Sequence, residues 1–237
     1  MMIYVVGLGP GSSQNITPQV SQILRECDAV IGYTTYIDLI RFLLEDKEIV
    51  ETGIKKERER CIKAVDLALE GKKVVVVSSG DSGVYGMASL IHEVAEPFPE
   101  LKIQVYPGIT AAVSGAPLSN DFAVISLSDL LTPWTAIEKR LICAAKGGFA
   151  ICLYNPSSKK RHNYLKKAVD IMSPYIPQET ICGFVTNIDR AEEHYTILSF
   201  KELGKSQVDM FTTVFIGNEQ TRLINGKMVT NRGYRIP

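Results

Sequence analysis

The sequence lacks an excess of either charge and lacks any long hydrophobic run. Its 237 residues include 26 basic and 26 acidic side chains, so no overall field would attract nucleic acid. No apolar stretch approaches the ~18 residues of a membrane span, and Met1 leads into a strand-like segment without a charged leader. These absences predict a cytoplasmic protein that binds neither nucleic acid nor membrane.

The cysteines are odd in number and widely spaced. The five cysteines are Cys27, Cys61, Cys143, Cys152 and Cys182. No two of them form a C-x-x-C pair, and the three histidines show no metal-ligand spacing with them. We expect free thiols buried in a reducing compartment and no bound metal.

Short β-rich runs alternate with helical patterns in the first half of the chain. Strands are predicted at residues 2–6, 29–31, 73–78 and 103–106, and helices from Pro18, after Thr17 as N-cap, and at residues 58–70. The four consecutive valines of residues 73–78 are typical of a strand covered on both faces. This alternation predicts an α/β fold with a mostly parallel sheet.

The pattern weakens between Ser114 and Trp134, a stretch that we interpret as a domain junction. Beyond it, helices are predicted near residues 136–145 and 159–172, strands at residues 149–154, 181–186, 195–199 and 212–216, and a hairpin turn at Asn225-Gly226. We therefore predict two α/β domains, residues 1–115 and 116–237.

Three loops rich in glycine follow three of the predicted strands. They are Gly7–Ser12, Gly80–Gly86 and Pro107–Ala112. Open α/β sheets bind ligands at the carboxyl ends of their strands, so these loops form the candidate site. The first loop does not fit the dinucleotide fingerprint G-x-G-x-x-G, because Ser12 stands at its last position. On spacing alone, a nicotinamide or flavin site and a tight turn without a ligand both stay open.

Three motifs stand in these loops in a fixed order. They are G-x-G-P-G-S from Gly7, G-D-S-G-V-Y-G from Gly80 and P-G-I-T-A from Pro107. Together they resemble the tetrapyrrole methylase family. Two further segments, Leu127–Trp134 and Leu153–Ser158, look like its precorrin-3B C(17)-methyltransferase and cobalt-factor III methyltransferase branch, and the resemblance covers nearly the whole chain.

The resemblance implies two α/β domains of the tetrapyrrole methylase type, with S-adenosylmethionine bound in the cleft between them, usually in a homodimer. It also implies methylation of ring carbon 17 of precorrin-3B or cobalt-factor III in cobalamin (vitamin B12) biosynthesis, with ring contraction and release of S-adenosylhomocysteine. Methylation of another corrin carbon, a nucleotide-dependent oxidoreductase and a non-catalytic ligand-binding module on the same fold stay open. The residues do not decide whether the substrate holds cobalt.

The resemblance further implies which positions contact the methyl donor. In the first half these are Leu8, Gly9, Pro10, Gly80, Asp81, Val84, Thr110 and Ala111. In the second half they are Tyr154, Asn155, Gly183 and Thr212. Many relatives have Gly-Asp-Pro where this chain has Gly80-Asp81-Ser82, which leaves the shape of that turn open. Asp81 either acts on the ligands or accepts hydrogen bonds from its own turn.

Other residues indicate how a tetrapyrrole would be bound. Lys159 and Arg161 could bind its acetate and propionate carboxylates, or else begin a solvated helix. Trp134 could pack on the flat macrocycle or belong to the core. Asp129 is our candidate acid or base for ring contraction, with helix capping as the alternative. The charge-alternating segment Lys55–Arg60 is interpreted as a solvated helical face.

Overall fold

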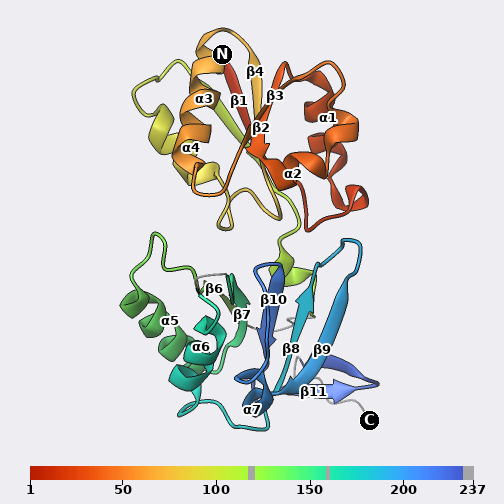
Figure 1. Ribbon diagram of the computed structural model, residues 1–237, viewed down its shortest axis with the longest axis vertical. Helices are drawn as coiled ribbons and strands as arrows, with labels where there is room; N and C mark the ends of the chain where they lie inside the picture. The colour runs from red at the N-terminus through yellow and green to blue at the C-terminus, as the bar shows by residue number, and fades with distance from the viewer. Residues whose placement is uncertain (117–120, 159–160, 232–237) are drawn as a thin grey trace. The chain divides into compact units, whose positions relative to one another are not determined.

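The computed structural model describes residues 1–116, 121–158 and 161–231. The chain divides into two compact units, Met1–Ala111 and Ala112–Pro237, and each is built on its own sheet (Figure 1). The predicted α/β class is confirmed. The predicted domains, residues 1–115 and 116–237, stay a prediction.

The first unit holds a five-stranded parallel sheet with strand order β3-β2-β4-β1-β5. Its strands are β1 (Met2–Gly7), β2 (Ala29–Tyr33), β3 (Glu48–Thr52), β4 (Lys73–Ser78) and β5 (Lys102–Tyr106). Its helices are α1 (Pro18–Glu26), α2 (Thr34–Asp38), α3 (Glu57–Leu69) and α4 (Ala88–Ala95), with short 3-10 helices at Ser13–Asn15 and Arg41–Leu43. Figure 1 shows α3 and α4 on one side of this sheet and α1 and α2 on the other.

Strand β4 is central in this sheet because it is apolar on both faces. Val74 and Val76 pack in the core with α3 and α4, whereas Val75 and Val77 pack in the core with α1 and α2. All four side chains are at most 1% exposed. The prediction of a strand covered on both faces is therefore confirmed.

The second unit holds a five-stranded mixed sheet with strand order β6-β7-β10-β8-β9 and a separate two-stranded hairpin. Its strands are β6 (Phe122–Ser126), β7 (Ala150–Tyr154), β8 (Ile181–Thr186), β9 (His194–Ser199), β10 (Thr212–Ile216), β11 (Thr221–Ile224) and β12 (Lys227–Thr230). Its helices are α5 (Trp134–Lys146), α6 (Tyr164–Met172) and α7 (Phe200–Leu203), and the 3-10 helix Ala111–Val113 spans the boundary at which the chain divides. Strands β6 and β7 are parallel and the other pairs antiparallel, and one core cluster joins the three helices to the sheet.

Local sequence patterns predicted some helix and strand boundaries correctly and missed others. The predicted cap of α1 is confirmed, since Thr17 Oγ1 accepts a 3.3 Å hydrogen bond from the Val20 N–H. The predicted hairpin turn is confirmed by the positive φ of Asn225 (48°) and Gly226 (73°) between β11 and β12. Strands β3 and β6 were not predicted, and helix α6 begins later than expected. The expected start of α6 at Lys159 lies outside the described residues.

The interpretation of Lys55–Arg60 as a solvated face is wrong for its last residue. Arg60 is only 4% exposed. Its guanidinium donates hydrogen bonds to Thr52 Oγ1 (2.7 Å) and to the Gly53 carbonyl (3.2 Å). Burial lowers the pKa of Arg60, because the charged form loses its hydration. The arginine therefore faces inward, where its guanidinium bonds the end of β3 and the residue after it.

The described residues form neither a membrane-spanning helix nor a cluster of metal ligands. Within residues 1–116, 121–158 and 161–231, no helix is long and apolar enough to cross a membrane. In the same part of the chain, no group of three or more His, Cys, Asp or Glu side chains could hold a metal ion. All five cysteines are free, and four are buried, whereas Cys143 is exposed.

Candidate functional site

The three glycine loops of the first unit meet because they follow adjacent strands. Strands β4, β1 and β5 are neighbours, and their parallel pairing puts all three carboxyl ends at one edge of the sheet. Gly9 and Gly80 exchange two backbone hydrogen bonds, of 3.1 and 2.7 Å. A Cβ on Gly108 would lie 2.2 Å from the Gly80 carbonyl oxygen, so the third loop packs directly on the second.

Asp81 joins two of these loops. One of its carboxylate oxygens accepts hydrogen bonds from the N–H groups of Gly83 (2.8 Å) and Val84 (3.1 Å). The other oxygen accepts a hydrogen bond from the N–H of Gly108 (3.0 Å). Three backbone donors therefore bind the carboxylate, which is the turn-forming arrangement that the sequence left open.

The structure brings the predicted donor positions of the first unit to this edge. They are Leu8, Gly9, Pro10, Gly80, Asp81, Val84, Thr110 and Ala111. Leu8 is 2% exposed and its side chain belongs to the core, so only its backbone can contact a ligand. A Cβ on Gly80 would lie 3.7 Å from Thr110 Cα, which places the second and third loops in van der Waals range of each other.

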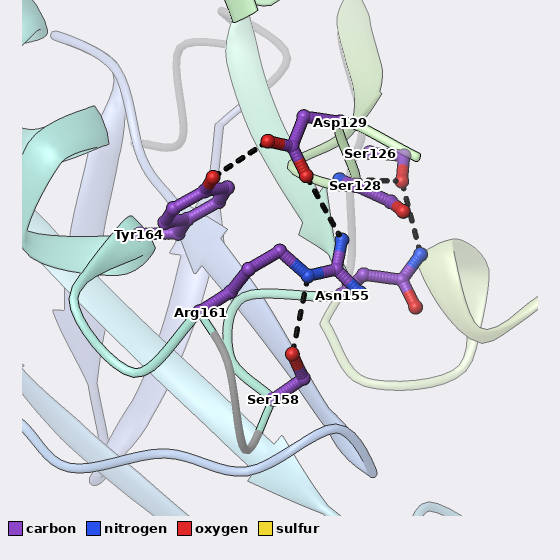
Figure 2. A network of polar contacts seen from close by, with 7 residues as sticks. All are labelled: Ser126, Ser128, Asp129, Asn155, Ser158, Arg161 and Tyr164. Carbon is purple, nitrogen blue, oxygen red and sulfur yellow. Dashed lines mark hydrogen bonds and ion pairs between the residues drawn. The ribbon is translucent and has the colours of Figure 1, made fainter. Parts of the chain in front are cut away.

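In the second unit, polar side chains gather where β6 and β7 end. This polar cluster, drawn in Figure 2, consists of Ser126, Ser128, Asp129, Asn155, Ser158, Arg161 and Tyr164. Because β6 and β7 pair in parallel, their carboxyl ends lie side by side. The candidate acid or base, Asp129, and the candidate substrate-binding residue, Arg161, are thereby brought together.

Asp129 has two partners of different kinds. The Tyr164 hydroxyl donates a 2.6 Å hydrogen bond to Asp129 Oδ2, and Arg161 Nη1 lies 3.8 Å from Asp129 Oδ1 (Figure 2). The hydrogen bond to Asp129 raises the pKa of Tyr164, so the hydroxyl keeps its proton. The alternative role of Asp129, capping helix α5, is wrong. The N-cap residue of α5 is Pro133, and no side-chain hydrogen bond caps this helix.

Trp134 lies next to this polar cluster in an aromatic pair. Its ring centroid is 4.7 Å from that of Tyr164, and the ammonium of Lys167 lies 5.6 Å and 4.8 Å from the two rings. Trp134 is only partly buried and also packs against the core of the unit. Lys159, the other predicted substrate-binding residue, lies outside the described residues.

Four positions of the second unit were predicted to contact the methyl donor, and two of them lie at this end of the sheet. Tyr154 is the last residue of β7, and its hydroxyl oxygen accepts a 2.7 Å hydrogen bond from the Ala112 N–H. Asn155 has a positive φ of 53° and donates a 2.9 Å hydrogen bond from its amide to Ser126 Oγ. Both side chains are therefore held in place by the segments that flank the cluster.

The other two positions lie elsewhere in the unit. Thr212 is 3% exposed, and its hydroxyl is already bonded to Asp209 (2.7 Å) and Thr186 (2.9 Å). Gly183 lies within β8 opposite Phe215 and lines a cavity of about 250 Å³. The structure does not bring Gly183 into the polar cluster.

Comparison with known proteins supplies the family. Residues 2–204 match the tetrapyrrole (corrin/porphyrin) methylases. The chain belongs to this family. Its motifs from Gly7, Gly80 and Pro107 are thus methylase motifs, as the sequence predicted, and the dinucleotide alternative loses its support.

Two curated methylases match along nearly their whole length. The "Probable cobalt-factor III C(17)-methyltransferase" of Salmonella typhimurium is 39% identical over 241 residues, which cover 99% of this chain and 100% of the relative. The "Precorrin-3B C(17)-methyltransferase" of Sinorhizobium sp is 36% identical over 231 residues, which cover 94% of this chain and 91% of the relative.

Solved methylase structures share the fold. The crystal structure of the methyltransferase CobJ is similar with a TM-score of 0.88 at 36% identity, covering 97% of this chain and 99% of CobJ. The uroporphyrin-III C-methyltransferase of Thermus thermophilus complexed with S-adenosylhomocysteine has a TM-score of 0.71 at 19% identity, with 92% of each chain covered. At that identity the second similarity supports the fold alone.

Sequence reasoning missed one functional candidate in this methylase, Tyr164. It lies three residues after Arg161 at the start of α6. An aromatic side chain with a hydroxyl group so close to a candidate substrate-binding residue could have indicated a second one. Its partner Asp129 lies 35 residues earlier, so the hydrogen bond itself could not be read from the sequence. Ser126 and Ser158, which support Asn155 and Arg161, gave no signal of their own.

We expect Asp81→Asn to destabilise the first unit. The asparagine keeps one oxygen for Gly83 and Val84 but presents an amide N–H₂ to the Gly108 N–H, which loses its acceptor. The free energy of unfolding in urea should fall by about 1–3 kcal/mol, the cost of leaving a donor unsatisfied. The matched control is Glu96→Gln on the exposed side of the unit, with a change below about 0.5 kcal/mol. Parent-like stability of Asp81→Asn would show that the link to Gly108 is unimportant.

Proposed function

We propose that this chain transfers the methyl group of S-adenosylmethionine to ring carbon 17 of precorrin-3B or cobalt-factor III in cobalamin biosynthesis. The observation that carries the proposal is the match of 99% of the chain to the "Probable cobalt-factor III C(17)-methyltransferase" of Salmonella typhimurium. The products are the methylated macrocycle and S-adenosylhomocysteine. Ring contraction by the same chain is part of the proposal.

The chemistry of methyl transfer fits the glycine loops of the first unit. Transfer from a sulfonium is an in-line displacement in which the positive charge of the donor disappears, so strong stabilisation of that charge would favour the ground state. Catalysis therefore depends on holding the methyl group and the nucleophilic carbon in line. Asp81 satisfies three backbone N–H groups and thereby fixes the loops. We propose that the loop backbone from Leu8, Gly80 and Thr110 onward contacts the donor.

We propose that the polar cluster of the second unit serves the tetrapyrrole. The substrate carries carboxylates, and a guanidinium can bind such groups with two hydrogen bonds. Arg161 has a donor atom, Nη1, without a hydrogen bond among the described residues. Trp134 and Tyr164 add an aromatic surface beside it. Asp129, between Arg161 and Tyr164, is the proposed acid or base for ring contraction.

One incubation tests the proposed function. The purified protein is incubated anaerobically with isotope-labelled S-adenosylmethionine and either metal-free or cobalt-bound precorrin-3-stage substrate, and products are read by mass spectrometry. We expect label at carbon 17 with at least one substrate, and calorimetric binding of about one donor per chain. Label on a different carbon, or tight binding of NAD(P) without a response to the donor, would contradict the proposal.

We expect Arg161→Ala to weaken tetrapyrrole binding and to leave donor binding unchanged. Loss of one hydrogen bond of about 0.5–1.5 kcal/mol corresponds to a Michaelis constant about twofold to tenfold higher for the tetrapyrrole. The matched control is Arg140→Ala, which removes an exposed arginine from α5. If Arg161 is only a solvated residue at the start of the helix and does not bind the substrate, both variants will have the parent's Michaelis constant for the tetrapyrrole.

Assembly and location complete the proposal. By family resemblance we propose a homodimer that works in the cytoplasm. Light scattering at micromolar concentration, which separates a 26.2 kDa chain from its dimer, tests the assembly directly.

A further inference from the structure

The Arg161 guanidinium is held in place but is not neutralised at close range. Its Nε donates a 3.1 Å hydrogen bond to Ser158 Oγ, which fixes the plane of the group. Its Nη1 is buried and has no hydrogen-bond partner among the described residues, whereas the side chain as a whole is 23% exposed and can be reached by a ligand. The nearest carboxylate oxygen, Asp129 Oδ1, lies 3.8 Å away, beyond the 2.7–2.9 Å of a charge-assisted hydrogen bond.

The second oxygen of Asp129 explains why the pair stays open. Asp129 Oδ2 accepts the 2.6 Å hydrogen bond from the Tyr164 hydroxyl, on the side of the carboxylate away from Arg161 (Figure 2). The Tyr164 ring is fixed in turn by Trp134, 4.7 Å away between centroids, and by the Lys167 ammonium at 4.8 Å. A firmly placed hydroxyl therefore competes with the guanidinium for one carboxylate.

We propose that Tyr164 is a positioning residue, which holds Asp129 back from Arg161 so that the guanidinium stays available to a carboxylate group of the substrate. The inference rests on the proposed function in one respect, namely that the substrate is a tetrapyrrole with acidic side chains. It adds the residue that sets how tightly this substrate binds. Asp129 contributes attraction that keeps the guanidinium in place, while its hydrogen-bonding capacity is directed to Tyr164.

Removal of the Tyr164 hydroxyl would change the partner of Asp129. In Tyr164→Phe the carboxylate loses its 2.6 Å donor, and the strongest donor left to it is Arg161 Nη1. A shift of about 1 Å would close the 3.8 Å ion pair into a charge-assisted hydrogen bond. An incoming carboxylate would then have to displace Asp129 before it could bind Arg161. Substrate affinity would fall although the arginine is still present.

The experiment compares Tyr164→Phe with Tyr175→Phe, which removes the hydroxyl of an exposed tyrosine in the same unit. For methyl transfer we expect Tyr164→Phe to raise the Michaelis constant of the tetrapyrrole about threefold to tenfold, with kcat and donor affinity within twofold of the parent. Tyr175→Phe should match the parent in all three. As a readout without turnover, fluorescence quenching should show a parallel loss of affinity for uroporphyrin III, a stable tetrapyrrole with eight carboxylates.

A second substitution makes the test decisive. In the double variant Tyr164→Phe with Asp129→Asn, the neutral amide cannot form the ion pair with Arg161. Loss of the Tyr164 hydroxyl should then have little effect, so the double variant should bind uroporphyrin III within twofold of the affinity of Asp129→Asn alone. The inference would be overturned if Tyr164→Phe kept the parent's affinity for uroporphyrin III, or if Asp129→Asn did not relieve the loss of affinity. It would also be overturned if only kcat fell in Tyr164→Phe, or if the parent bound no porphyrin. Porphyrin binding that responds as expected without methylation of carbon 17 would instead reject the proposed function.

Discussion

Gly108→Ala should weaken S-adenosylmethionine binding about fivefold to 150-fold and lower the free energy of unfolding by about 1–3 kcal/mol, the typical cost of overpacking. The new Cβ would lie 2.2 Å from the Gly80 carbonyl oxygen and 2.6 Å from the Gly7 carbonyl carbon. Both neighbours are backbone atoms, which cannot rotate away as a side chain can. The three glycine loops must therefore separate, and the Gly108 N–H must move off Asp81.

Calorimetry of donor binding and urea denaturation measure the two effects. The matched control is Gly53→Ala in the same unit, because a Cβ at Gly53 meets nothing within 4 Å and its φ is not positive. We expect that control to bind the donor as the parent does. Parent-like donor affinity in Gly108→Ala would mean that the close packing of the loops is not needed for the donor site.

The parts of the fold that could be predicted are those with a strong local pattern. Strand β4 was predicted because four apolar residues in a row must be buried on both faces, and the glycine loops because they interrupt such runs. Strand β3 was missed because it is an edge strand with Glu48 and Glu51 exposed, and β6 because its flanks read as a junction. Pairing with a neighbour strand, which no local window contains, decides both.

The site shows the same division. Arg161 was proposed because it follows the predicted strand of residues 149–154, and Asp129 and Trp134 because a charged and an aromatic residue are conspicuous in the predicted junction. The bonds that give them their geometry join residues far apart in sequence, such as Asp81 to Gly108 and Tyr164 to Asp129. These contacts exist only because parallel strands bring their carboxyl ends together, so only the folded chain reveals them.

Asp129→Asn should slow ring contraction about 10²- to 10⁴-fold, the usual contribution of a general acid or base, while donor binding stays as in the parent. Ring contraction must move protons and break a carbon–carbon bond, whereas methyl transfer from the sulfonium needs no protein acid. Asparagine cannot take up or release the proton. Its carbonyl oxygen can still accept the hydrogen bond from the Tyr164 hydroxyl that Asp129 Oδ2 accepts in the parent.

The structure removes the main competing explanation for such a result. If Asp129 capped α5, asparagine would serve equally well, but the cap position is Pro133 and carries no side-chain hydrogen bond. The remaining structural role is the ion pair with Arg161, which at 3.8 Å and partial exposure contributes little stability. Thermal unfolding should therefore change little. Mass spectrometry of the methylated and the contracted products, measured separately, decides the role: contraction at the parent rate would eliminate Asp129 as the acid or base, whereas methylated but uncontracted product would identify its step.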